Sequence, residues 1–116
     1  MTNYRINGFD QMKAFFKMVF NSQKKIRPTH VSLYMFLLNQ NNRCGWNEWF
    51  KIPYDTGMTG SCIGSRKTYY KTLRELKEIG VIDYIPGINE NKSPMVKIIP
   101  ISIKPQENKQ VEDDSE

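Results

Sequence analysis

Apolar residues recur most regularly between residues 65 and 79, at intervals of three or four positions that predict an amphipathic helix. At about 3.6 residues per turn, one side of this helix collects Tyr69, Thr72, Leu73, Leu76 and Ile79. The other side carries five cations and one aromatic within an arc of about 140°: Arg66, Lys67, Tyr70, Lys71, Arg74 and Lys77. Ser65 is suited to cap the start of the helix, and Gly80 is suited to end it.

Two further helices are predicted in the first half of the chain. Residues 7–21 repeat aromatic and apolar side chains at helical spacing, which favours a core helix over a dimer surface. Residues 29–40 are apolar on most sides, as expected for the central helix of a small domain, with Thr29 as its cap. His30 is expected at the surface rather than as a ligand, because no partner His, Asp or Glu stands at metal-binding spacing.

A short strand is predicted within residues 46–52. Trp46 and Trp49 are expected to pack against the central helix rather than to stack on a base or sugar. Residues 53–64 predict a short, poor helix followed by a tight turn, because three glycines weaken it by about 1 kcal/mol each.

Residues 81–85 and 95–103 are rich in β-branched side chains and predict two strands. The turn-forming segment between them predicts a hairpin with a long polar tip at residues 86–95. Pro100 indicates an edge position for the second strand.

The length and charge of the whole chain indicate its domain organisation and the class of partner that it binds. The 116 residues predict a single domain over residues 1–105, followed by a disordered acidic tail over residues 106–116. The tail holds five acids and one base, which leaves 16 bases and 7 acids, a net charge of +9, in the rest. A body with that charge suggests a polyanionic partner, most commonly nucleic acid.

Other classes of function find little support. No apolar run is long enough to cross a bilayer and no signal-peptide pattern opens the chain, so a cytoplasmic protein is expected. Cys44 and Cys62 form no CxxC pair and are expected to be free thiols; with a single His, they suggest neither a metal site nor a thiol oxidoreductase. Because neither a phosphate-binding loop nor a nucleophile–His–acid set is present, we expect no cofactor and no enzymatic activity.

The order of the predicted elements is that of a winged helix-turn-helix domain with an extra N-terminal helix. The predicted fold class is therefore mainly α with a small β-hairpin (α+β), with residues 7–21 as the extra helix and residues 29–104 as the core. The stretch TGSCIGSRKTYYKTLRELKEIGVIDYIPG resembles the helix-and-wing signature of bacterial and phage winged-helix DNA-binding domains. The resemblance is closest to replication-initiation and primosome-type proteins and to small regulators of Bacteroides-like genomes. The matching positions are Gly64, Ser65, Arg66, Lys67, Thr68, Leu73, Leu76, Gly80, Val81 and Ile82, whereas the glycine-rich residues 55–60 depart from the family's usual helix.

This resemblance implies non-catalytic binding of double-stranded DNA, in replication initiation or transcriptional regulation. The predicted DNA-binding residues lie in the helix 65–79 and in the hairpin: Ser65, Arg66, Lys67, Thr68, Tyr70, Lys71, Arg74, Lys92 and Lys97. Arg66 and Lys67 are placed to read a guanine edge, Ser65 and Thr68 to bond phosphate, and the other cations to bind the backbone.

A second reading is a protein-interaction module that assembles a larger complex, with replication or transcription proteins as partners. Many helix-turn-helix proteins read paired half-sites, so a homodimer through the N-terminal helix is kept as an alternative to its purely core role.

Overall fold

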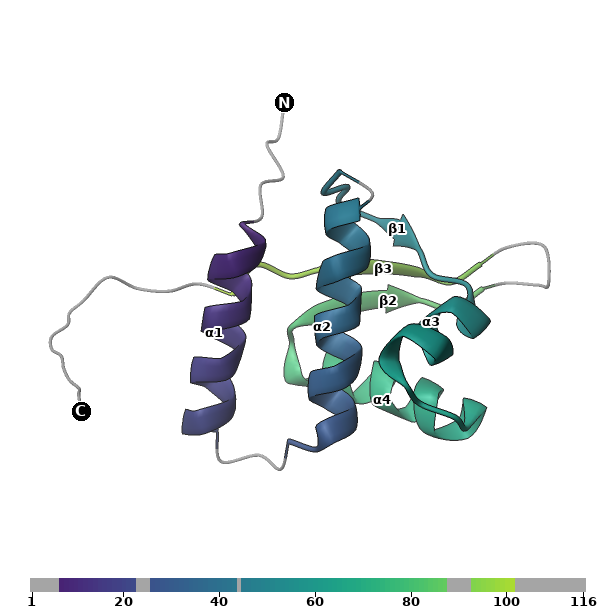
Figure 1. Ribbon diagram of the computed structural model, residues 1–116, viewed down its shortest axis with the longest axis horizontal. Coiled ribbons are helices and arrows are strands. Elements are labelled where there is room, and N and C mark those ends of the chain that lie inside the picture. Colours follow the sequence, from purple (N-terminus) through teal and green to yellow (C-terminus); the bar gives the residue numbers. More distant parts are fainter. Residues whose placement is uncertain (1–6, 23–25, 44, 88–92, 102–116) are drawn as a thin grey trace, which may run out of the picture.

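The computed structural model describes residues 7–22, 26–43, 45–87 and 93–101. These residues form four helices and a three-stranded antiparallel sheet, so the fold is mostly helical with a small sheet, as the predicted α+β class requires (Figure 1). The elements are α1 (Gly8–Asn21), α2 (Pro28–Arg43), β1 (Phe50–Lys51), α3 (Tyr54–Ser61), α4 (Arg66–Ile79), β2 (Ile82–Ile85) and β3 (Met95–Ile98). The acidic tail, Cys44 and residues 88–92 of the hairpin tip, Lys92 among them, lie outside the described residues.

Helix α2 lies at the centre of the molecule. It contacts α1 on one side and α3 and α4 on the other (Figure 1). Leu33 and Leu37 are fully buried, and the Tyr34 ring stacks on that of Phe15 from α1 with 4.1 Å between centroids. The core role of the N-terminal helix is therefore confirmed at Phe15, but it is wrong for Phe9 and Phe20, which are exposed.

The predicted cap at Thr29 is wrong, because α2 already begins at Pro28. Proline suits the first helical position, where its missing N–H would have had no intrahelical acceptor. The N–H of Arg27, just before the helix, instead donates to Nδ1 of His30 over 2.9 Å.

The sheet has the strand order β1-β3-β2, so β3 is the central strand. Ile98 pairs with Ile82 and Val96 pairs with Tyr84 on one side, and Val96 also faces Phe50 on the other. The edge position predicted from Pro100 is therefore wrong. The strand ends at Ile98, before Pro100, so this proline sits outside the ladder and removes none of its hydrogen bonds.

The glycine-rich segment forms an eight-residue helix, α3, and the expected tight turn follows it. A Cβ at Gly57 would overlap the buried Tyr69 side chain of α4, and one at Gly60 would overlap the Phe36 ring of α2. These glycines lower the helix propensity but allow α3 to approach both neighbours closely. Cys62 ends the helix in the left-handed conformation, with φ at 62°.

Gly57→Ala should therefore destabilise the protein. The substitution favours an isolated helix by about 1 kcal/mol, but overpacking against Tyr69 costs about 1–3 kcal/mol and should prevail. Urea unfolding followed by circular dichroism measures the change. Gly64→Ala is the matched control, because nothing lies within 4 Å of a Cβ there. Equal midpoints for the two variants would contradict this packing role.

Candidate nucleic-acid interface

Helix α4 is fixed in orientation by one fully buried face. Tyr69, Leu73 and Leu76 have no exposed surface, and Thr72 is buried beside them. The Ser65 hydroxyl accepts the N–H of Thr68 over 3.2 Å, and Gly80 ends the helix in the left-handed conformation at φ 98°. The predicted caps are confirmed, and the buried face determines which residues point to solvent.

The opposite side of α4 forms a surface that we call the basic face: Arg66, Lys67, Tyr70, Lys71, Arg74 and Lys77. Its five cations are exposed and Tyr70 is half-buried. Within the described parts of the chain, Lys67, Lys71 and Arg74 have no ion-pair partner. Cations that make no such ion pair remain available to an external anion such as phosphate.

Arg66 is held at the start of the basic face by Tyr54 of α3. Its Nη2 donates to the Tyr54 hydroxyl over 2.6 Å, and the guanidinium lies over the ring, 4.2 Å from the centroid. Because Arg66 carries the first helical position of α4 and Tyr54 that of α3, this contact joins the starts of the two helices. It leaves the guanidinium exposed but restricts its orientation.

The hairpin supplies two predicted site residues, of which the structure describes only Lys97. Val96 and Ile98 point into the core, so Lys97 between them lies on the other face of the sheet. There it pairs with Glu48 at 2.8 Å and lies 5.9 Å from the Trp49 ring centroid. Lys92 lies outside the described residues. The structure thus places the seven predicted residues of segment 65–79 on α4 or at its cap, and Lys97 on the sheet.

His30 is buried, which contradicts the predicted surface position. Only 3% of the residue is exposed, and its Nε2 lies 2.7 Å from Oε1 of Glu75 in α4. The hydrogen bond from His30 lowers the pKa of the Glu75 carboxyl, burial opposes this shift, and the charges of Arg27 and Lys71 add to the lowering. Sequence reasoning missed this link between α2 and α4 because 45 residues separate the two partners.

A groove of about 610 Å³ adjoins the basic face where α3, α4 and the ends of β2 and β3 meet. Tyr54, Tyr70, Arg74 and Tyr84 line it from three different elements. Burial, assisted by the neighbouring Tyr70, raises the pKa of Tyr84 to about 12, although Arg74 opposes the shift. The Tyr84 hydroxyl is therefore neutral at physiological pH. Sequence reasoning did not predict this groove, since its tyrosines are far apart along the chain.

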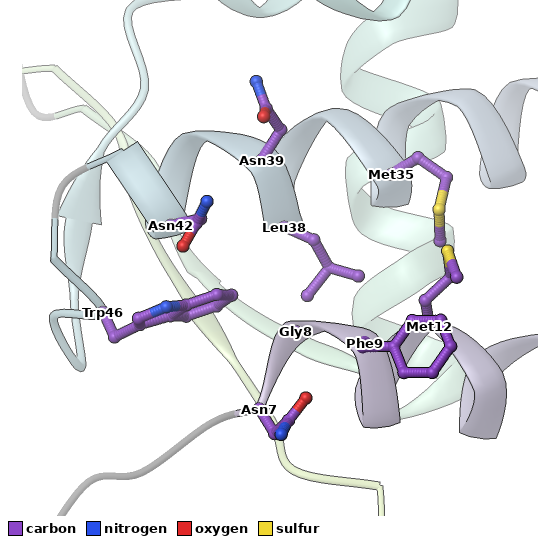
Figure 2. Close-up of a pocket in the computed structure, with 9 residues that line it drawn as sticks. All are labelled: Asn7, Gly8, Phe9, Met12, Met35, Leu38, Asn39, Asn42 and Trp46. Atoms are coloured by element: carbon purple, nitrogen blue, oxygen red, sulfur yellow. The ribbon is translucent and has the colours of Figure 1, made fainter.

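A second hollow, of about 520 Å³, lies between α1 and the end of α2 (Figure 2). Met12 and Met35 face each other at one end and Trp46 closes the other, with Leu38 between them. The expected packing of Trp46 against α2 is confirmed, whereas Trp49 lies beside Lys97. On α1, Phe9 is 63% exposed and Phe20 is 85% exposed.

Two negative findings concern the described residues alone. No group of three or more His, Cys, Asp or Glu side chains there could hold a metal ion. None of the helices in that part of the chain combines the length and apolar character that a bilayer crossing requires.

No protein-family model, curated protein or solved structure matches this chain.

The Glu75–His30 contact predicts a pH-dependent contribution to stability. A lowered carboxyl pKa stabilises the folded state above the unfolded value of 4.5, and this contribution is lost as the pH falls through the folded value. Glu75→Gln should lower the urea midpoint at pH 7 and differ little from the unchanged protein near pH 3. Glu78→Gln, at an exposed position of the same helix, is the matched control. A deficit for Glu75→Gln that stays constant from pH 7 to pH 3 would rule out this role.

Proposed function

We propose that this chain is a winged helix-turn-helix domain that binds double-stranded DNA without catalysis, in the cytoplasm of a bacterium. The order α2, β1, α3, α4, β2, β3 supports this proposal, since it is the element order expected of such a domain. In this reading α1 is the extra N-terminal helix, α4 is the recognition helix, and the β2–β3 hairpin is the wing. Replication initiation and transcriptional regulation are the two roles that the resemblance favours.

The observation that carries the proposal is the basic face of α4. A helix with its side chains is about 10–12 Å across, which matches a major groove about 12 Å wide. The fully buried Tyr69, Leu73 and Leu76 hold α4 in place, so its cations meet an incoming duplex together. In this proposal Arg66 and Lys67 approach base edges, while Lys71 and Arg74 contact phosphates.

The remaining predicted residues have supporting roles in this proposal. Ser65 and Thr68 lie at the N-terminal end of α4, where free N–H groups and the helix dipole favour a phosphate. Tyr70 lies among the cations and adds an aromatic surface. Lys97 would have to leave Glu48 to reach DNA, so we assign it a smaller contribution than the α4 cations. Lys92 remains a predicted wing contact.

The exposed aromatics of α1 favour a second candidate function, a protein-interaction module. Phe9 and Phe20 belong to α1, and α1 lies across α2 from α4 (Figure 1), so a partner bound to them would leave the basic face open. The predicted homodimer would use this same surface. Sedimentation over a range of protein concentrations tests the homodimer, and a monomer throughout would contradict it.

Lys71→Ala combined with Arg74→Ala should weaken binding to every duplex sequence, because both side chains are assigned to phosphates. Each phosphate contact contributes roughly 0.9 to the slope of log affinity against log salt, so the slope should flatten by about 1.8. Gel shifts with random-sequence duplex across a salt series measure both effects.

Lys13→Ala combined with Lys17→Ala is the control, because it removes the same charge from exposed positions on α1. This control should lower affinity far less and leave the slope nearly unchanged. Equal effects of the two double variants would show that net charge alone drives binding. Negligible duplex affinity in the unchanged protein at low salt would instead favour the interaction module.

A further inference from the structure

The groove beside the basic face is lined by aromatic side chains, which are not needed for the phosphate contacts proposed for α4. Its wall contains the aromatic rings of Tyr54, Tyr70 and Tyr84, which come from α3, α4 and β2. Arg74 also lines it, so the groove and the basic face share Tyr70 and Arg74. A DNA strand bound along the cations of the basic face would therefore lie next to the groove at Tyr70 and Arg74.

The chemistry of the groove fits a flat aromatic group attached to an anion. Tyrosine rings bind a nucleobase by stacking, and Arg74 can bind the adjoining phosphate. The carboxylate of Asp55, at the groove's edge, accepts from its neighbour Thr56 and can also accept from the amino group of a base. Tyr84 also lines the groove, and its hydroxyl can donate to or accept from the edge of a base.

The groove cannot serve a base that is still paired. Inside a duplex both faces of each base are covered by its neighbours, so a paired base in the interior offers no face for stacking on a side chain. A duplex is also too wide to enter a hollow of about 610 Å³, whereas a single nucleotide fits.

We propose that this tyrosine-lined groove binds one unpaired nucleotide of a DNA strand while the basic face of α4 holds the adjoining duplex. The inference rests on the proposed DNA-binding function and makes it more specific. The preferred ligand is then a duplex with an unpaired base, as in an overhang or a locally opened site, rather than an uninterrupted blunt duplex.

The test compares two DNA probes that differ at one end. One is a blunt duplex, and the other is the same duplex with a fluorescent 2-aminopurine as the last base of one strand and the opposing nucleotide omitted. The second probe carries one phosphate fewer, so its charge cannot account for tighter binding. The unchanged protein should bind the second probe about tenfold more tightly, since stacking contributes about 1–3 kcal/mol per base. It should also quench the 2-aminopurine fluorescence.

Substitutions in the groove should remove this preference. Tyr70→Leu should bring the affinity ratio of the two probes close to one and abolish the quenching, while Tyr70→Phe, which keeps the ring, should retain both. Tyr54→Leu, at a more exposed position, gives a second test if Tyr70→Leu fails to fold. Because this substitution also releases Arg66, which would contact both probes, only the ratio of the two affinities and the quenching are compared. Phe20→Leu is the control, because it removes an exposed aromatic from α1 and should leave the ratio unchanged.

The outcomes separate this inference from the function on which it rests. Equal affinity of the unchanged protein for both probes, with no quenching, overturns the groove proposal and leaves duplex binding intact. A preference that survives in both leucine variants also overturns it, because the unpaired base is then bound elsewhere. Failure to bind either probe at low salt overturns the DNA-binding function and the groove proposal together.

Discussion

The burial of one side of α4 is the constraint on which the rest of the molecule depends. Tyr69, Leu73 and Leu76 lose all contact with solvent against α2, α3 and the sheet. Burying a large apolar side chain contributes about 1.5–3 kcal/mol, so these residues together stabilise one orientation of the helix strongly. The opposite side must then face outward, and the sequence places five cations there. One face of α4 thus belongs to the core, and the opposite face forms the proposed interface.

The neighbours of α4 refine this orientation through specific contacts. Gly57 lets α3 approach Tyr69 so closely that even a methyl group has no room. Buried His30 forms a hydrogen bond with Glu75 and so links α2 to α4. This hydrogen bond engages the one carboxylate oxygen, Oε1 of Glu75, that His30 contacts on α4. Arg66 stacks on Tyr54 and joins the starts of α3 and α4. Each contact fixes the position of α4, which reduces the ordering cost of binding a rigid partner such as duplex DNA.

The sequence predicts the elements well because their signals are local. The period of apolar residues, the caps Ser65 and Gly80, and the β-branched strands all act within a few positions. Features that depend on distant residues were missed: His30 was expected at the surface because its partner is 45 residues away. The central position of β3 depends on pairing with β1, which the proline at residue 100 does not reveal. The tyrosine groove escaped prediction for the same reason, whereas the α4 cluster was predictable because one helix carries it.

The central claim is that the rigid α4 presents its cations to a duplex as one surface. The most direct measurement is a nuclear magnetic resonance titration of the labelled protein with a short blunt duplex, followed through the backbone amide shifts. The account predicts that the largest shift changes fall on exposed positions of α4, from Arg66 to Lys77, with few on α1. Changes concentrated on α1, or spread evenly over every lysine-bearing segment, would contradict it.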